Sequence, residues 1–227
     1  MRGRARPWAG AILALGLVAC GSPPLVSLAP HDCPTSAPTA SEATTLLADA
    51  QRAVVTTTLG TFTIELDATS APIATANLVA LARCDFYAGI TFHRVIAGFV
   101  AQAGDPGTRT HRGSFDGLGT GGPGYHFEVE FPDASQPYDR YTVAMANALQ
   151  YDAVSGDITS GRDTNGSQFF IDLASLPQLR PYYSVLGKVT QGTDVIDTIG
   201  AVSVNNPQDG IPVEPVIIQS ITIESGT

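Results

Sequence analysis

The sequence predicts a mainly β domain, either a closed antiparallel barrel or a sandwich. After residue 53, short runs of β-branched and aromatic residues recur between Gly and Pro residues, and only two segments show helical periodicity. The length of 227 residues, with 44% hydrophobic and 15% charged residues, fits one globular domain with short extensions. This composition excludes a wholly disordered or collagen-like chain.

The first nineteen residues predict a signal peptide. Three arginines precede an apolar run from Trp8 to Ala19, which as a helix would span roughly 18 Å, less than the ~30 Å hydrocarbon core of a membrane. The stretch from Leu17 to Cys20 resembles the bacterial lipobox, in which the cysteine is lipidated and the chain is cut before it. The alternative is an ordinary secretory signal with Cys20 incidental. We expect residues 1–19 to be removed and a lipid on Cys20 to anchor the protein at the outer face of the cell membrane or in the periplasm.

Residues 20–52 predict a flexible spacer. They are rich in Ser, Pro, Thr and Ala and lack hydrophobic alternation, so they offer too little apolar surface to offset the entropy of ordering. A short helix is expected only within Glu42–Arg52. Cys33 in this spacer and Cys84 could form a disulfide in an oxidising compartment, or both could remain free thiols.

The domain itself is expected to begin with a β-hairpin. Two β-branched runs, Val54–Thr58 and Thr61–Leu66, flank a turn that contains a glycine. Ser70 offers an N-cap for a helix over 71–83, and a second helix is predicted at Thr193–Ile199. The other predicted strands are short runs broken by Gly and Pro: Thr91–Ile96, Phe99–Ala103, His126–Phe131, Thr142–Ala146, Gln168–Leu173, Ser184–Val189 and Val216–Glu224.

The charge of the chain argues against nucleic-acid partners. The formal net charge is −9, and removal of the three N-terminal arginines with residues 1–19 would make it −12. Non-specific binding to nucleic acid needs a basic surface that releases counterions from phosphates. We therefore expect no nucleic-acid partner.

Five segments in consistent order resemble the sequence signature of the cyclophilins, which are peptidyl-prolyl cis-trans isomerases. They are Phe92–Asp105, Gly119–Gly122, Ala144–Ala148, Thr164–Phe170 and Leu186–Val189. The resemblance covers roughly residues 53–224 and implies, for a domain at 53–227, a closed eight-stranded antiparallel β-barrel with two capping α-helices. It further implies an enzyme that acts on X–Pro bonds of proline-containing polypeptides, needs no cofactor or metal, and works as a monomer.

Such an enzyme needs a hydrogen-bond donor rather than a nucleophile. Rotation about an X–Pro bond disrupts amide resonance at a barrier of ~18–20 kcal/mol, and no bond is broken. At the twisted transition state the prolyl nitrogen regains its lone pair, so a donor aimed there binds the transition state more tightly than either planar state. By resemblance, Arg94 is this catalytic donor, and Gln102 beside it helps to orient the substrate and the arginine.

The resemblance also assigns the residues that bind substrate. The pocket for the proline ring comprises Phe99, Val100, Phe170, Leu179 and Tyr183. The groove for the extended peptide comprises Gly119, Ala146, Asn147, Ala148 and Gln168, with hydrogen bonds from the Asn147 main chain. Because alternate residues of a strand share a face, Gln168 and Phe170 can both point at the site. The structural alternatives are that Arg94 is a surface arginine in an ion pair and that the two phenylalanines belong to the core.

A second function remains open at this point, a module or chaperone that binds proline-containing segments without significant turnover. The presence of Arg94 together with Gln102, Phe99 and Phe170 favours the enzyme, because a binder needs no donor at the prolyl nitrogen. Two other patterns predict no site. Gly119–Gly122 lacks the lysine of a P-loop, and the histidines lack the spacing of metal ligands.

Three features depart from the family pattern. Gln178 stands where many cyclophilins have tryptophan, and Tyr183 stands where many have histidine. The larger departure is the segment of fifteen residues Leu149–Asp163, where short members have only a few. This segment is predicted to be a solvated polar loop beside the groove that acts sterically on long substrates. The alternative is a calcium site, although the spacing of its carboxylates does not match an EF-hand.

Overall fold

The computed structural model describes residues 32–110, 117–133, 135 and 138–226. The predicted signal peptide and the predicted lipidation site Cys20 lie outside the described residues. In the part of the chain that is described, no helix is long and apolar enough to cross a membrane.

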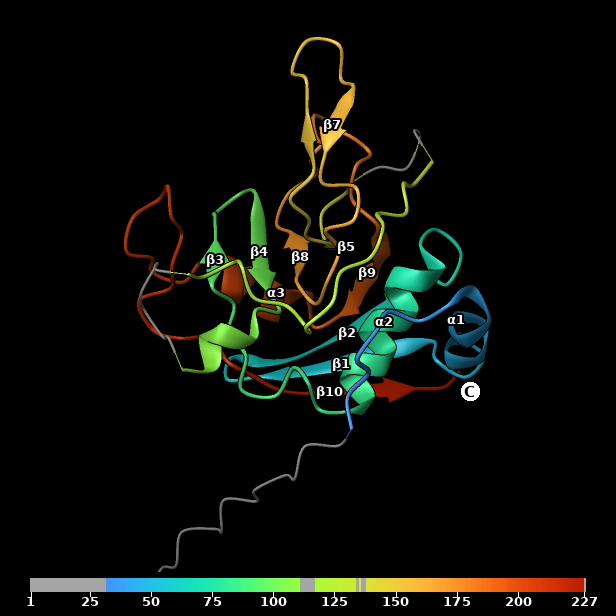
Figure 1. Cartoon of the computed structure of the whole chain (residues 1–227). Coiled ribbons are helices and arrows are strands. Elements are labelled where there is room, and N and C mark those ends of the chain that lie inside the picture. The colour runs from blue at the N-terminus through green and yellow to red at the C-terminus, as the bar shows by residue number, and fades with distance from the viewer. Residues whose placement is uncertain (1–31, 111–116, 134, 136–137, 227) are drawn as a thin grey trace, which may run out of the picture.

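Eight strands form one curled sheet in the order β10-β1-β2-β9-β5-β8-β4-β3 (Figure 1). Every neighbouring pair in this order is antiparallel, which confirms the predicted mainly β fold with eight antiparallel strands. The strands are β1 (Arg52–Thr57), β2 (Gly60–Leu66), β3 (Arg94–Val95), β4 (Val100–Ala103), β5 (Thr142–Met145), β8 (Phe169–Asp172), β9 (Val185–Gln191) and β10 (Ile218–Glu224).

The sheet does not close into the predicted barrel, because its two edge strands do not pair with each other. β3 and β10 do not pair as strands, and among the described residues their edges are joined by the isolated bridge between Thr91 and Ile217 and by a few flanking backbone hydrogen bonds. The N–H of Val95 in β3 donates instead to the carbonyl of Gly210, at 2.7 Å. The loop that contains Gly210 therefore occupies the place beside β3 that a full strand pair would need.

Residues 126–131, predicted as a strand, form no regular strand. Phe127 makes an isolated bridge with Asn165. Glu130 has a different role, because its carboxylate accepts hydrogen bonds from the N–H groups of Ile73 and Ala74 at 3.1 and 2.8 Å. This segment therefore serves the end of a helix rather than the sheet.

The helix that Glu130 caps is α2 (Pro72–Arg83), close to the predicted range. The predicted N-cap is wrong, since the N-cap position is Ala71 and it makes no side-chain cap. Ser70 uses its backbone N–H and its hydroxyl to bind Asp67 instead. The orphan N–H groups of the first turn are therefore satisfied from a distant loop rather than from the preceding residue.

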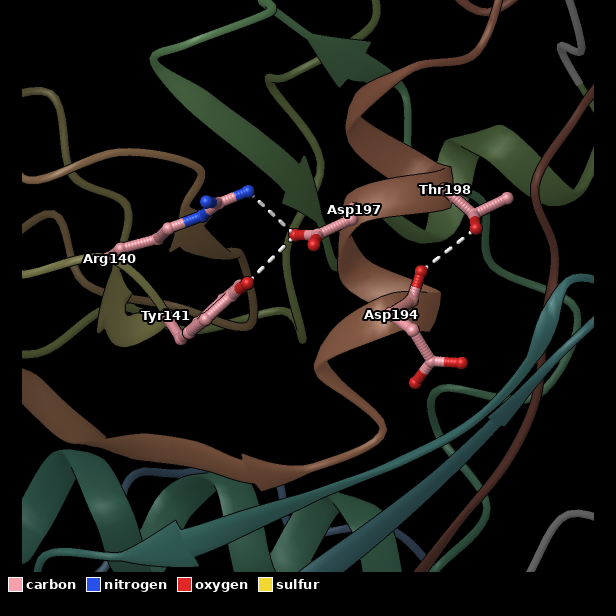
Figure 2. A network of polar contacts seen from close by, with 5 residues as sticks. All are labelled: Arg140, Tyr141, Asp194, Asp197 and Thr198. Atoms are coloured by element: carbon pink, nitrogen blue, oxygen red, sulfur yellow. Dashed lines mark hydrogen bonds and ion pairs between the residues drawn. The ribbon is translucent and has the colours of Figure 1, made fainter.

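The second predicted helix is α3 (Thr193–Gly200). Figure 2 shows how it is held, with Asp197 accepting hydrogen bonds from Arg140 and from the hydroxyl of Tyr141, at 2.8 and 2.9 Å. In the same helix Thr198 donates to the carbonyl of Asp194. Arg140 and Tyr141 directly precede β5, so α3 is tied to the start of that strand.

Part of the predicted spacer is structured. Helix α1 (Ala40–Leu47) begins with a capping box, in which Thr39 and Glu42 satisfy each other's backbone N–H groups. It packs against α2, and Cys33 forms a disulfide with Cys84 at the end of α2, with 5.3 Å between their Cα atoms. This helix overlaps the short helix predicted within Glu42–Arg52, and it is stabilised by its own capping box and by the bond of Cys33 to the distant Cys84.

The core has two parts, and the smaller one supports the site. The main cluster fills the inside of the sheet and includes Phe169 and Ile171 of β8. Phe170, between them in the sequence, points to the other face of β8 and belongs to the second cluster. The second cluster consists of Val100, Tyr138, Ala144, Phe170, Leu176 and Val185.

The insertion at 149–163 forms a two-stranded hairpin rather than an irregular loop. Its strands are β6 (Gln150–Tyr151) and β7 (Ile158–Ser160), paired antiparallel. The hairpin projects from the eight-stranded sheet, as the yellow segment in Figure 1 shows. We call residues 149–163 the arm.

Candidate active site

A cavity of about 270 Å3 lies over the second core cluster. Nine predicted site residues line it, and they come from β3, the turn after it, β4 and β8 and from the segments that follow β5 and β8. They are Arg94, Phe99, Val100, Gln102, Ala146, Asn147, Phe170, Leu179 and Tyr183. The topology explains why these residues meet, because β3 and β4 form a hairpin and β8, which lies far from them in the sequence, pairs with β4 in the sheet.

A second cavity of about 310 Å3 contains the three remaining predicted residues, Gly119, Ala148 and Gln168. The two cavities share Gln102, Ala146 and Asn147 in their linings. They are therefore adjoining parts of one groove, which we call the groove below. All twelve residues that the resemblance assigned to catalysis and substrate binding line it.

Arg94 lies at the edge of the first cavity. It is the cross-strand partner of Gln102, and its guanidinium carbon lies 5.8 Å from the centroid of the Phe99 ring. The guanidinium makes no ion pair or hydrogen bond with any described residue. Among the described residues Arg94 is therefore not the ion-paired surface arginine of the alternative interpretation. Its N–H donors are available to a molecule in the cavity.

Gln102 and Gln168 connect the two cavities through a chain of hydrogen bonds. The Gln102 amide donates to Oε1 of Gln168 at 3.0 Å, and the Gln168 amide donates to the carbonyl of Gly121 at 2.8 Å. This chain fixes which end of each amide faces its neighbour. The groove wall next to Arg94 is therefore pre-organised.

The apolar wall of the first cavity is built on the second core cluster. Phe170 and Val100 are buried, whereas Phe99, Leu179 and Tyr183 are partly exposed and pack against that cluster. The rings of Phe170 and Tyr183 meet edge to face, with 5.2 Å between centroids. The phenylalanines thus serve the core and the cavity at the same time.

Tyr183 is locked in place from behind by Tyr138. The Tyr138 hydroxyl donates to the carbonyl of Tyr183 at 3.0 Å and accepts from its N–H at 3.2 Å. Burial raises the pKa of Tyr183, and the neighbouring Tyr151 of the arm raises it further. The hydroxyl of Tyr183 therefore stays protonated at neutral pH.

The backbone at Asn147 is available to a peptide. The N–H of Ala146 donates to the carbonyl of Gln168, and the N–H of Ala148 donates to the hydroxyl of Thr164, both at 2.9 Å. Between them, neither backbone group of Asn147 has a partner among the described residues. The Asn147 side chain is engaged, since its amide donates to the carbonyl of Tyr182.

Asp105 was missed as a site residue, although it ends the first cyclophilin-like segment. It is fully buried, and its carboxylate accepts hydrogen bonds from the N–H groups of Gly107, Gly119 and Gly121, at 2.8, 2.7 and 3.2 Å. It therefore holds the glycine segment that lines the second cavity. A Cβ added at Gly121 would lie 2.1 Å from Oδ1 of Asp105, so the glycine there permits the close approach.

Two other buried ionisable groups lie near the groove. His93 is buried, and burial lowers its pKa to about 4, so the ring is neutral. A buried neutral ring indicates a structural role. Asp172 ends β8 and is the cross-strand partner of Val100, a lining residue. No pattern in the sequence distinguishes this aspartate from an exposed one.

Comparisons with known proteins show the family of this chain. The family described as "Cyclophilin type peptidyl-prolyl cis-trans isomerase/CLD" matches residues 52–223. A peptidyl-prolyl cis-trans isomerase of Helicobacter pylori is 40% identical over 155 residues, which are 67% of this chain and 82% of that protein. A probable peptidyl-prolyl cis-trans isomerase A of Mycobacterium leprae is 41% identical over 140 residues, 61% of this chain and 64% of that protein.

Solved structures give the same result. The crystal structure of a cyclophilin-type peptidyl-prolyl cis-trans isomerase from Cryptosporidium parvum superimposes with a TM-score of 0.64 at 31% sequence identity, covering 78% of this chain and 99% of that one. A second structure of that protein, in the presence of the dipeptide Ala-Pro, superimposes with a TM-score of 0.62.

Proposed function

The chain belongs to the cyclophilin-type peptidyl-prolyl cis-trans isomerases, and we propose that it isomerises X–Pro bonds of exported polypeptides with Arg94 as the donor to the prolyl nitrogen. The isomerase activity follows from the family. The identity of the donor, the arrangement of the substrate and the place of action are what we propose. The observation that carries the mechanism is the Arg94 guanidinium, which has no ion-pair or hydrogen-bond partner among the described residues and lies at the cavity that Phe99, Phe170 and Tyr183 line.

The proposed step is a rotation without bond cleavage. As the X–Pro bond twists, conjugation between the carbonyl and the prolyl nitrogen is lost and the nitrogen becomes pyramidal with a free lone pair. An N–H of Arg94 then hydrogen-bonds to that lone pair, an interaction that the planar ground states do not offer. The guanidinium keeps its proton at every physiological pH, so the donor is always present.

The arginine supplies only part of the acceleration. A hydrogen bond from a charged donor contributes ~1.5–3 kcal/mol, and each ~1.36 kcal/mol corresponds to a factor of ten in rate. Arg94 thus accounts for about one to two orders of magnitude. The remainder comes from holding the proline ring against Phe99, Phe170 and Tyr183 while the preceding residue turns.

The groove beyond the proline would bind the rest of the peptide as an extended strand. The N–H and carbonyl of Asn147, which have no partner among the described residues, offer the donor and the acceptor that an added strand requires. The family binds proline-containing peptides, as the structure of the relative in the presence of Ala-Pro indicates. In this chain the dipeptide would place its proline ring in the first cavity and its chain past Asn147.

Export is proposed on three grounds. Residues 1–19 have the pattern of a signal peptide, Cys20 follows in a lipobox-like context, and Cys33 is bonded to Cys84, as is usual in oxidising compartments. The protein would then act on polypeptides outside the cytoplasm, tethered by a lipid to a membrane. Mass measurement of the mature N-terminus tests the tether, because an unmodified terminus at any residue other than Cys20 would refute it.

The mechanism is tested by peptide turnover and peptide binding together. Arg94→Ala should lower kcat/KM for a proline-containing tetrapeptide by about ten- to a hundredfold and change the dissociation constant of that peptide by less than about threefold. Arg83→Ala is the matched control, because this arginine is paired with Asp49 and lies outside the groove. Equal turnover in wild type and Arg94→Ala would refute the donor role, and binding without any turnover by the wild type would support the alternative of a binding module.

A further inference from the structure

The arm carries a concentration of exposed apolar side chains that the isomerisation step does not use. Val154 at its turn is 95% exposed, Tyr151 on β6 is 44% exposed, and Phe131 at its base is 38% exposed. These are three of five large hydrophobic residues that are exposed within the described part of the chain. Single exposed hydrophobic residues are ordinary, whereas a cluster on one projection marks a binding surface.

The turn that presents Val154 is firmly built. The carboxylate of Asp152 accepts from the N–H groups of Val154 and Ser155, at 2.9 and 2.7 Å. The Tyr182 hydroxyl donates to the carbonyl of Gly156, and Arg180 donates to the carbonyl of Ala153. The arm is therefore held by hydrogen bonds to the segment 180–182. These bonds fix the turn, so Val154 is exposed in a defined position.

Aromatic rings connect the arm to the first cavity. Within the arm and its base, Tyr182 contacts Tyr151 and Phe131, with ring centroids 5.2 and 6.2 Å apart. Tyr183 follows Tyr182 directly and meets Phe170 in the cavity wall. We call these five residues the aromatic track.

The ends of the arm also belong to the groove. Ala148, just before it, and Thr164, just after it, both line the second cavity, and they are hydrogen-bonded to each other at 2.9 Å. The exposed surface of the arm is thus continuous with the surface that is proposed to bind the extended peptide.

The charges on the arm limit the chemistry of its partner. Arg180 lies over the ring of Tyr151 and Arg162 lies over the ring of Phe131, with 5.2 Å between each guanidinium carbon and ring centroid. Asp152 and Asp157 flank the turn that displays Val154. Because Arg180 also donates to the carbonyl of Ala153 in this turn, the two arginines offset the two aspartates. These charges therefore favour neither an acidic nor a basic partner, and the surface suits a chain with aliphatic or aromatic side chains.

We propose that the arm and the aromatic track form an extended substrate subsite, which binds apolar side chains of the same polypeptide several residues away from the proline in the groove. This inference rests on the proposed function. It assigns the enzyme a preference for unfolded chains, whose apolar residues are exposed, over folded surfaces. The arm then attracts long substrates, in contrast to the purely steric role predicted from its length.

The reach of the arm sets the spacing. Tyr151 is three residues and Val154 six residues beyond Ala148, which at ~3.3 Å per residue correspond to at most roughly 10 and 20 Å. A substrate whose extended chain passes Ala148 therefore meets this surface with residues about three to six positions beyond the one that lies at Ala148. A tetrapeptide cannot reach the turn.

The test compares three substrates that each contain one proline. They are a tetrapeptide and two thirteen-residue peptides with a central proline, one with leucine and one with serine at the positions four to six residues from the proline on both sides. For the wild type we expect kcat/KM to be about three- to tenfold higher for the leucine peptide than for the serine peptide, carried by KM, because partial burial of one or two apolar side chains contributes of this order.

Val154→Ser tests the surface without disturbing the fold, because this side chain is 95% exposed. The variant should bring the ratio of leucine to serine peptide close to one and leave turnover of the tetrapeptide unchanged. Val213→Ser is the matched control, since Val213 is 60% exposed and lines neither cavity, and it should retain the wild-type ratio.

Two results would overturn the subsite. One is a wild-type ratio near one, and the other is a loss in Val154→Ser that is equal for the tetrapeptide and the leucine peptide. Binding of the two long peptides to Arg94→Ala, followed by fluorescence anisotropy, separates this proposal from the proposed function. If the wild type shows no turnover of any peptide, the proposed function fails, whereas tighter binding of the leucine peptide still supports the subsite and equal binding refutes it.

Discussion

Replacement of Asp172 by asparagine should make the protein more stable at alkaline pH and leave it nearly unchanged in acid. Asp172 is fully buried, and neither oxygen of its carboxyl group has a hydrogen-bond partner among the described residues. Burial, with a smaller contribution from the nearby Asp139, raises its pKa from 3.8 to about 8. Asparagine has a similar shape and no charge, so it removes the titration and keeps the packing.

The magnitude follows from the linkage between protonation and folding. Below pH ~4 the carboxyl is protonated in both the folded and the unfolded chain, and its ionisation costs nothing. Between pH ~4 and ~8 the unfolded chain loses the proton and the folded chain keeps it, so the free energy of unfolding decreases by up to ~1.36 kcal/mol per pH unit. Above pH ~8 the difference stays constant. Since water penetration and relaxation reduce such penalties, we expect a gain on the order of 2–4 kcal/mol for Asp172→Asn at pH 8.

Urea unfolding at pH 4, 6 and 8 measures this effect. Other carboxylates also change the stability of the wild type with pH, and the difference between variant and wild type cancels them. Asp157→Asn, at an exposed position of the arm, is the control and should show no pH-dependent difference. A difference for Asp172→Asn that is constant from pH 4 to pH 8 would show that the buried carboxyl does not titrate as argued.

Three further outcomes are expected. Asp105→Asn should raise KM for a tetrapeptide about three- to tenfold, because the hydrogen bonds from Gly119 and Gly121 of the glycine segment are weakened. Asp67→Asn, which caps a loop outside the groove, should not raise KM, and equal effects would indicate a general loss of stability. Replacing Cys33 and Cys84 together by serine should lower the free energy of unfolding by ~4 kcal/mol, from a separation of 51 residues, with kcat/KM unchanged; a loss of activity in the folded variant would contradict this separation. Tyr183→Ala should raise KM about tenfold by removing a wall of the proline pocket, whereas Tyr183→Phe should retain activity, and a defect in Tyr183→Phe would mean that the hydroxyl takes part.

The twelve residues that the resemblance assigned all line the groove, whereas several elements of the fold around it differ from their prediction. Leu179 and Tyr183 lie on a segment without regular secondary structure, so no periodicity could place them, and they were found by resemblance alone. Arg94 and Gln102 could also be paired by reasoning from strands, because residues opposite each other in an antiparallel hairpin share a face. The resemblance identified the set of residues. The structure shows in addition that they line two adjoining cavities.

The differences between prediction and structure have a common physical origin. In each case a contact with a residue far away in the sequence determines the local structure, and patterns among neighbouring residues do not show such contacts. Ser70 has the right residue type for an N-cap, yet Glu130 from a distant loop caps the helix instead. The composition of residues 20–52 predicts a spacer with at most a short helix, whereas the disulfide of Cys33 with Cys84, 51 residues away, and the packing of α1 on α2 tie part of it to the domain. Asp105 appears in the sequence as one more acidic residue, and its role depends on backbone groups fourteen and sixteen residues away.

The covalent loop closed by Cys33 and Cys84 ends before the first residue of the groove, Arg94. The molecule therefore keeps its covalent reinforcement and its recognition chemistry on separate lengths of the chain. Substitutions that change stability can therefore accumulate between Cys33 and Cys84, and substitutions that change substrate preference can accumulate from Arg94 onwards. Neither set needs to affect the property that the other set changes.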